Sequence, residues 1–334
     1  MNYTIATIGS HSALQILKGA RDEGFKTLLF VLREKLEFYS QYSFIDKFEC
    51  LKNYRDLLKI ETRYKNKNII LIPHGSFVAY LGKDFDSQTS FKYFGNKRIL
   101  AVEADRSWQQ NWLIKAGLLT PKIFKTHQKV DRPVIVKAYG AKGGLGYLLC
   151  PDNRSLKEAL KNFNKEKIII QEYITGTPVY IHFFYSPINE KLEIMGCDRR
   201  YESDIDGIGR IPAEFQKSMV NDPSFTVIGN IPIVLRESIL AKIYTLGKSL
   251  IRASKKIAPP AGLFGPFCLE TVIDGKMNIY AIEISSRLVA GTNLFINGSP
   301  YTDLLFNKPV SGGRRIAMEI KKAVNNNQLD KILT

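Results

Sequence analysis

Two glutamates in the C-terminal half, Glu270 and Glu283, have the type and spacing to bind a metal ion. Each is the carboxylate of a largely apolar, strand-like run, Phe267–Ile273 or Ile279–Ile284, and a turn of the hairpin type begins between them at Asp274. Because side chains alternate faces along a strand, a six-residue loop would set the two glutamates opposite each other, about 5 Å apart at the backbone. Carboxylates that close repel unless a proton or a cation separates them. A hard cation such as Mg2+ or Mn2+ would fill this role.

The residues that follow Glu283 favour a metal site over the alternative, two glutamates on the solvated face of a hairpin. Arg287 adds a fixed positive charge four residues later, and a loop rich in glycine and asparagine follows at 291–300. An acid pair, an arginine and a flexible loop together are typical of a metal–phosphate site. We therefore predict that Glu270 and Glu283 bind the metal and that Arg287 is a catalytic residue.

A lysine-bearing strand followed by a glycine-rich loop provides a second phosphate-binding signal. The run 132–138 carries Lys137, and the loop after it includes Gly143 and Gly144. Glycines let backbone N–H groups approach phosphate oxygens, and lysine adds a mobile positive charge. The loop lacks the Walker A pattern, so a flexible cover over phosphates fits better than a P-loop. A plain hairpin turn is the alternative.

A further hydrophobic strand ends in the sequence Gln-Glu-Tyr-Ile. Its backbone and the residues Gln171, Glu172 and Ile174 are suited to holding an adenine and its ribose. Together with Lys137, which we also predict to be a catalytic residue, and the glycine loop, this segment predicts an ATP site.

The N-terminal region repeats a strand–turn–helix pattern with polar residues in each turn. The strand 3–8 ends at Ser10-His11-Ser12, and the strand 68–72 ends at the turn that holds Ser76. Ligands collect at the carboxyl ends of parallel strands, and helix N-termini attract anions. We therefore expect His11, Ser12 and Ser76 to share one anionic ligand. The alternative for such a serine is a simple helix N-cap.

The composition is that of an ordinary globular protein with a strong positive charge. The 334 residues include 48 basic and 32 acidic side chains, for a net charge of +16. This surplus suits phosphorylated small molecules, and the lack of a compact basic run or a known RNA- or zinc-binding motif disfavours nucleic acid as a partner. No apolar run reaches the length of a membrane span and no basic signal region opens the chain, so we expect no membrane partner and a cytoplasmic location.

Some side chains are expected to serve packing only. The four widely spaced cysteines are predicted to be reduced and buried. Trp108 and Trp112, one turn apart on a helix over 105–115, are expected in the core, as is His182. A closing amphipathic helix is expected over Arg314–Ile332, with its basic face in solvent.

The order of these motifs resembles the ATP-grasp superfamily: a basic strand with a glycine-rich loop, a Gln-Glu-Tyr-Ile hinge, and two late glutamates ending in Glu-Ile-x-x-Arg. Within it, segments along nearly the whole chain are similar to the archaeal formate-dependent FAICAR synthetases. These segments are 10–19, 75–79, 93–98, 198–203, 226–232 and 291–293.

The resemblance implies an enzyme that joins formate to the amine of aminoimidazole carboxamide ribonucleotide (AICAR) with ATP, in purine biosynthesis. It implies that His11, Ser76 and Asn230 contact AICAR and that Glu202 contacts ATP. It also implies Mg2+ at Glu270 and Glu283, transfer of phosphate through formyl phosphate, and a homo-oligomer. Many ATP-grasp enzymes have asparagine where this chain has Ser285, which leaves the third metal ligand open.

The predicted fold is α/β (α+β), with an N-terminal Rossmann-like pre-ATP-grasp domain at 1–95 and a two-lobed ATP-grasp region at 96–334. The lobes are expected at about 96–186 and 187–334. Two alternatives to FAICAR synthesis stay open: a paralogue that ligates another carboxylate to a ribonucleotide, and a non-catalytic protein that binds nucleotides or RNA.

Overall fold

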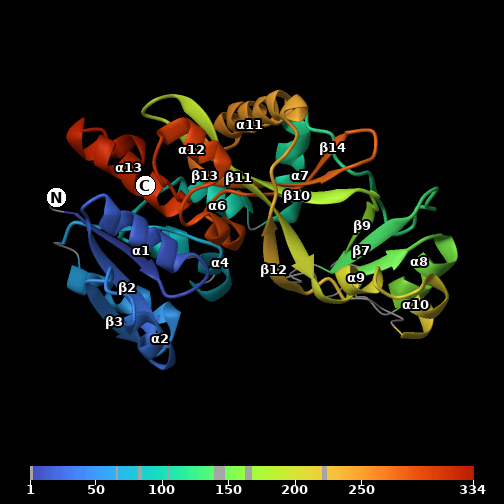
Figure 1. The fold of residues 1–334 in the computed structure, drawn as a ribbon, viewed down its shortest axis with the longest axis horizontal. Coiled ribbons are helices and arrows are strands. Elements are labelled where there is room, and N and C mark those ends of the chain that lie inside the picture. Colours follow the sequence, from blue (N-terminus) through green and yellow to red (C-terminus); the bar gives the residue numbers. More distant parts are fainter. Residues whose placement is uncertain are drawn as a thin grey trace.

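Three sheets in a row form the framework of the protein (Figure 1). The computed structural model describes residues 3–64, 67–81, 85–103, 105–138, 147–161, 168–219 and 224–334. A parallel N-terminal sheet lies at one end, an antiparallel central sheet in the middle, and a smaller antiparallel sheet at the other end. Within the described ranges, no helix has both the length and the apolar character that crossing a membrane requires. This mixed architecture confirms the predicted α/β class.

The N-terminal sheet has the strand order β3-β2-β1-β4-β5, with every neighbouring pair parallel. Its strands, in chain order, are β1 Thr4–Ile8, β2 Lys26–Leu32, β3 Lys47–Leu51, β4 Ile69–Leu71 and β5 Lys92–Tyr93. The connecting helices are α1 Ala13–Asp22, η1 Arg33–Lys35, α2 Leu36–Ser40, η2 Tyr54–Asp56, α3 Leu57–Ile60, η3 Glu61–Tyr64, α4 Ser76–Leu81 and α5 Phe85–Gln88. The apolar runs of β1 and β4 form interior strands because a parallel sheet is covered on both faces. Gly24 follows α1 with a positive φ of 87°, as a glycine stop does.

The smaller sheet has the order β6-β9-β7-β8, with all neighbours antiparallel. Its strands are β6 Ile123–Phe124, β7 Val134–Ala138, β8 Tyr147–Cys150 and β9 Ile168–Glu172, and the helices near it in the chain are α6 Lys97–Glu103, α7 Arg106–Lys115 and α8 Asn153–Lys161. Leu156 and Ala159 of α8 pack on Val134 and Val136 of β7, which gives this sheet a core of its own. Gly143 and Gly144 lie outside the described residues.

The central sheet has the order β12-β11-β10-β13-β14 and is antiparallel throughout. Its strands are β10 Thr177–Ser186, β11 Lys191–Glu202, β12 Val227–Pro232, β13 Gly265–Ile273 and β14 Ile279–Ser285. The remaining helices are α9 Ser203–Ile208, α10 Ala213–Met219, α11 Glu237–Ile257, η5 Ala290–Phe295, α12 Pro300–Phe306, α13 Gly312–Asn325 and η6 Leu329–Lys331.

The two faces of the central sheet differ in character. Ile181, Leu269 and Ile284 are direct cross-strand partners and share a core cluster with Ile243 and Leu250 of α11. Because side chains alternate along a strand, the neighbouring positions point to the opposite face. That face carries the polar residues described below.

The N-terminal sheet is joined firmly to the C-terminal part of the chain. Helices α1 and α13 lie side by side (Figure 1) and cross at two glycines. A Cβ at Gly19 would lie 2.2 Å from the backbone nitrogen of Arg314, and a Cβ at Gly313 would lie 2.2 Å from the carbonyl oxygen of Gln15. At the C-terminus, Thr334 exchanges two backbone hydrogen bonds with Tyr93 of β5. These contacts hold the N-terminal sheet and the C-terminal part of the chain in a fixed relation.

Several packing expectations differ from the structure. Trp112 is fully buried, as expected, but Trp108 is 51% exposed because it lies on the outer side of α7. Cys50 is exposed, whereas the other three cysteines are buried and all four are free thiols. The closing helix ends at Asn325, and Arg315 on its basic side is buried rather than solvated.

The expected lobe division at 186 cuts through the β10–β11 hairpin. Strand β10 pairs with β11 and β13 in the central sheet. We therefore propose a division at 173–176, between β9 and β10, and keep the expected N-terminal boundary at 95, which lies just after β5.

Candidate active site

The acid pair lies at the heart of the β13–β14 hairpin. Glu270 and Glu283 are direct cross-strand partners, so the predicted opposition of the two carboxylates is confirmed. The loop was predicted wrongly, because Ile273 pairs with Ile279 and leaves five residues between them. A bulge after Glu270 shifts the register by one residue and restores the pairing. The bulge therefore supplies the one-residue shift in register that we had expected from a sixth loop residue.

The environment of the acid pair is charged and largely buried. The Nη2 atom of Arg200 donates to Glu270 Oε1 at 2.8 Å, and the guanidinium lies 4.1 Å from the centre of the Tyr180 ring. Burial raises the pKa of Glu270; Arg200 opposes this shift, and the charge of Glu283 adds to it. A carboxyl whose pKa is raised in this way gains when a cation binds beside it.

Lys137 of β7 approaches the acid pair from the smaller sheet. Its Nζ donates to Gln171 Oε1 at 2.7 Å. Burial lowers the pKa of Lys137 to about 8, while Glu283 and Glu270 hold it up and Arg106 lowers it further. The structure therefore brings the predicted phosphate lysine, the hinge glutamine and the acid pair into one electrostatic environment.

A cavity of about 340 Å³ is lined by Lys137, Gln171 and Glu283 among other residues. It lies between α7 and strands β6, β7, β9 and β14, and its size and mixed lining suit a small-molecule ligand. The lining residues are Arg106, Ser107, Gln109, Gln110, Asn111, Ile114, Ile123, Lys137, Ile169, Gln171, Ile282 and Glu283. The contribution of α7 was missed in the sequence, where this helix carries no motif beyond its row of polar side chains.

Other predicted ATP contacts lie elsewhere. Glu172 points away from Gln171: its carboxylate accepts hydrogen bonds from Arg132 Nη1 at 2.6 Å and from the backbone N–H of Lys122 at 3.0 Å. Ile174 is half-buried beyond the end of β9 and is not part of the cavity lining. Glu202 ends β11, and burial raises its pKa while Arg200 opposes the shift.

The second group of predicted residues meets at the carboxyl ends of β1 and β4. Ser76 Oγ lies 2.8 Å from His11 Nδ1 and donates to Ser10 Oγ at 2.8 Å. Burial lowers the pKa of His11, and Arg287 and Lys35 lower it further. His11 and Ser76 thus come together as predicted, whereas Ser12 is fully buried and donates to the carbonyl oxygen of Val289.

Arg287 lies between the two groups. Its Nη2 pairs with Glu103 Oε1 at 2.7 Å, and the other Glu103 oxygen accepts from Ser286. A Cβ at Gly75 would lie 3.2 Å from Arg287 Nη1 and 3.3 Å from His11 Cδ2, so the arginine stands beside the His11–Ser76 turn. Its charge lowers the pKa of both His11 and Glu270.

Asn230 lies on β12, at the far edge of the central sheet, and its Nδ2 donates to Asp198 Oδ2 at 2.6 Å. Asp198 is fully buried and its other oxygen contacts His182 Nε2 at 2.5 Å. No signal in the sequence marks this His182–Asp198 pair, because the two residues are adjacent only through strand pairing.

The carboxylate oxygens of Glu270 and Glu283 suit a divalent cation that is bound jointly with a ligand. Among the residues that the structure describes, no group of three or more His, Cys, Asp or Glu side chains could by itself hold a metal ion. Two opposed carboxylates, one of which lines the cavity, would leave most coordination positions to water and phosphate oxygens, which is how Mg2+ is usually bound.

Comparison with known proteins gives matches along the chain. Three family models match: a protein of unknown function (DUF1246) at residues 5–124, a RimK-like ATP-grasp domain at 109–178, and a domain of unknown function (DUF1297) at 153–334. Two curated relatives are named 5-formaminoimidazole-4-carboxamide-1-(beta)-D-ribofuranosyl 5'-monophosphate synthetase, the product being FAICAR. The relative from Sulfolobus acidocaldarius is 45% identical over 99% of both chains. The relative from Pyrococcus horikoshii is also 45% identical over 99% of both chains.

Solved structures agree with these matches. An IMP biosynthesis protein PurP from Thermococcus kodakaraensis is 33% identical, with a TM-score of 0.81 over 99% of this chain and 100% of that one. An N5-carboxyaminoimidazole synthetase from Staphylococcus aureus, solved with ADP, has a TM-score of 0.62 over 88% of this chain and 72% of its own; at 16% identity it supports the fold alone. The chain belongs to the FAICAR synthetase family and is an ATP-grasp ligase.

Proposed function

We propose that this ligase joins formate to the 5-amino group of AICAR, with conversion of ATP to ADP and phosphate, in purine biosynthesis. The product is the one in the names of the relatives. The observation that carries the proposal is the meeting of Lys137, Gln171 and Glu283 on one cavity, with Arg287 between the acid pair and the His11–Ser76 turn.

ATP would occupy the cavity between α7 and the smaller sheet. Burial lowers the pKa of Lys137 to about 8, so the lysine is mostly protonated at pH 7 and its charge would face the phosphates. Gln171 fixes the lysine through their hydrogen bond. Glu270 and Glu283 would hold Mg2+ or Mn2+, which when bound offsets the negative charge of the transferring phosphoryl group.

AICAR would lie toward the ends of β1 and β4, with His11, Ser76 and Asn230 as its contacts. His11, with its lowered pKa, is neutral at pH 7, so one ring nitrogen can donate a hydrogen bond and the other can accept one. Arg287, paired with Glu103 on one side, brings a positive charge to the region between the two substrates.

The proposed reaction has two steps. A formate oxygen takes the γ-phosphoryl group, which forms formyl phosphate and releases ADP. The amine nitrogen of AICAR then attacks the formyl carbon; the new C–N bond forms, the bond to phosphate breaks, and the nitrogen releases a proton. Arg287 and Lys137 stabilise charge that grows on phosphate and carbonyl oxygens.

The test is ADP release from Mg-ATP in four mixtures, with AICAR and formate each present or absent. We expect release only when both are present, and loss of release in Glu283→Ala. Glu158→Ala is the matched control, since it removes an equal charge from the exposed surface of α8. ADP release that is the same with and without formate would indicate another acyl donor. A protein that binds neither ATP nor AICAR would overturn the proposal.

A further inference from the structure

Behind Asn230 lies a buried polar relay formed by Asp198 and His182. Asp198 shares Tyr180 as a cross-strand neighbour with Glu270, so its side chain points to the same face of the central sheet as the acid pair. Asp198 and His182 are almost fully buried, at 0% and 2% exposure, while Asn230 is half-buried at the outer end. A buried carboxylate needs hydrogen-bond donors, and here the donors are His182 Nε2 and Asn230 Nδ2.

The relay fixes which way the Asn230 amide faces. A carboxylate only accepts hydrogen bonds, so Asn230 presents its NH2 group to Asp198. Its carbonyl oxygen must then be turned away from Asp198. An oxygen in that position accepts a hydrogen bond from an N–H or O–H donor and repels another acceptor.

Neighbouring groups hold the relay in place. A Cβ at Gly291 would lie 2.5 Å from Asp198 Oδ1, so the η5 loop closes directly on the carboxylate and requires glycine there. Phe295 of the same loop packs against the His182 ring, with 6.1 Å between ring centres. Neither Asp198 nor His182 can move without moving this loop.

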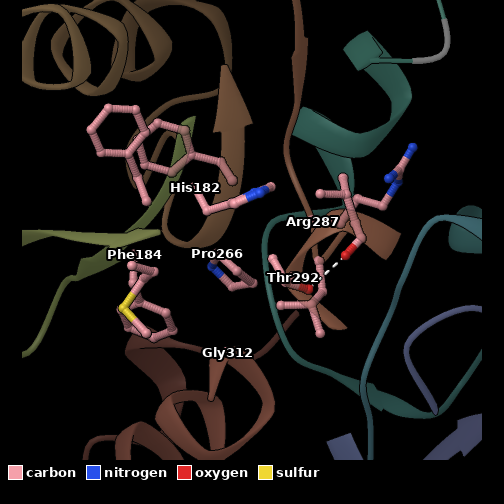
Figure 2. A pocket seen from close by; sticks show the side chains of 11 residues that line it. His182, Phe184, Pro266, Arg287, Thr292 and Gly312 are labelled. Carbon is pink, nitrogen blue, oxygen red and sulfur yellow. Dashed lines mark hydrogen bonds between the residues drawn. The ribbon is translucent and has the colours of Figure 1, made fainter. Parts of the chain in front are cut away.

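A small cavity lies beside both His182 and Arg287. His182 Nδ1 and Arg287 Nε are both buried and have no hydrogen-bond partner among the described residues. Both residues lie on the wall of one small cavity of about 10 Å³ (Figure 2), which is about the size of one water molecule.

We propose that Asp198 and His182 are positioning residues that lock the Asn230 carbonyl oxygen toward the substrate amine. They would thereby select a ribonucleotide whose imidazole carries a free 5-amino group. This rests on the proposed function, because it assumes that AICAR binds at Asn230. The relay touches no substrate itself; it acts through Asn230.

The experiment measures, by calorimetry, the affinity for AICAR and for the analogue that lacks the 5-amino group. The wild type is expected to prefer AICAR by about tenfold, the value of one hydrogen bond. Asp198→Asn lets the Asn230 amide turn over, because the new side chain can donate as well as accept. We expect this variant to lose the preference and to keep its affinity for ATP.

A second pair of variants guards against a folding defect. His182→Gln keeps a nitrogen donor for Asp198 and should retain the preference. His182→Phe removes the donor that holds the Asp198 carboxylate in position, so Asp198 no longer fixes the Asn230 amide and the preference should be lost. Unchanged preference in both Asp198→Asn and His182→Phe would overturn the proposal, as would equal loss of both ribonucleotides together with ATP. A wild type that binds no AICAR would instead refute the proposed function.

Discussion

Two regions of the molecule combine one arginine with two glutamates, and they differ in access rather than in charge. Around Arg315, Nε and Nη2 donate to Glu193 and Nη1 donates to Glu319, while Ser186 adds a hydrogen bond to Glu319. All three charged side chains are at most 5% exposed. Around Arg200, the arginine donates to Glu270, and the second carboxylate, Glu283, lines a large cavity.

The difference shows how the same charges serve either structure or binding. The Arg315 group joins α13 to β11 of the central sheet, where each carboxylate receives a hydrogen bond from the arginine. The Arg200 group leaves like charges opposed across a hairpin, in a place that a ligand can reach. We conclude that the first group stabilises the fold, and we propose that the second holds opposed charges that a bound cation would relieve.

The largest effect is expected from breaking the Arg315 group. Arg315→Met leaves two buried carboxylates without their partner, and the free energy of unfolding should fall by about 3–5 kcal/mol. Chemical denaturation measures this. A variant with Met at positions 193, 315 and 319 removes the charges together and should recover most of the loss. A loss below about 1 kcal/mol in Arg315→Met would contradict the structural interpretation.

The opposite result is expected at the acid pair. Glu283→Gln keeps the size of the side chain and removes one of two repelling charges, so stability without metal should stay the same or rise slightly. Turnover should fall by about 10²–10³-fold, as for loss of one electrostatic contact in a transition state. Parallel denaturation and ADP-release assays compare the two quantities. If Glu283→Gln lowered stability and turnover by the same free energy, Glu283 would instead serve the fold, as the Arg315 group does.

The sequence reveals the acid pair, Glu270 and Glu283, more readily than the Arg315 group. Period-two alternation and a turn signal are local, so the opposition of Glu270 and Glu283 could be predicted, and parallel-strand topology similarly predicted that His11 and Ser76 meet. The Arg315 group joins residues 122 positions apart, and a basic helix face alone predicts solvent exposure. The compensating bulge in the hairpin was also invisible, because nothing local marks which residue is left unpaired.

The part that α7 plays in the cavity could not be predicted for a related reason. Its polar side chains form an ordinary helix surface in the sequence, and they become a ligand wall only when the helix packs beside β14. The Asp198–His182 pair follows the same rule, since it depends on the register of β10 against β11. In both cases, contacts between elements that are distant in the sequence bring the residues together.

The smallest effect is a pH dependence that arises from Lys137, which approaches the acid pair. Burial lowers the pKa of Lys137 to about 8, so the folded protein releases this proton before the unfolded chain does. As pH rises from about 8 toward the ordinary lysine value near 10.5, the unfolded state holds more protons, and stability should rise on account of this group.

Binding of ATP should change in the other direction, because the neutral amine no longer attracts phosphate. We expect kcat/KM for ATP to fall about tenfold per pH unit above pH 8. Lys137→Arg, whose charge persists, should give a flat profile over the same range. A wild-type profile as flat as that of Lys137→Arg would show that the lysine does not face the nucleotide.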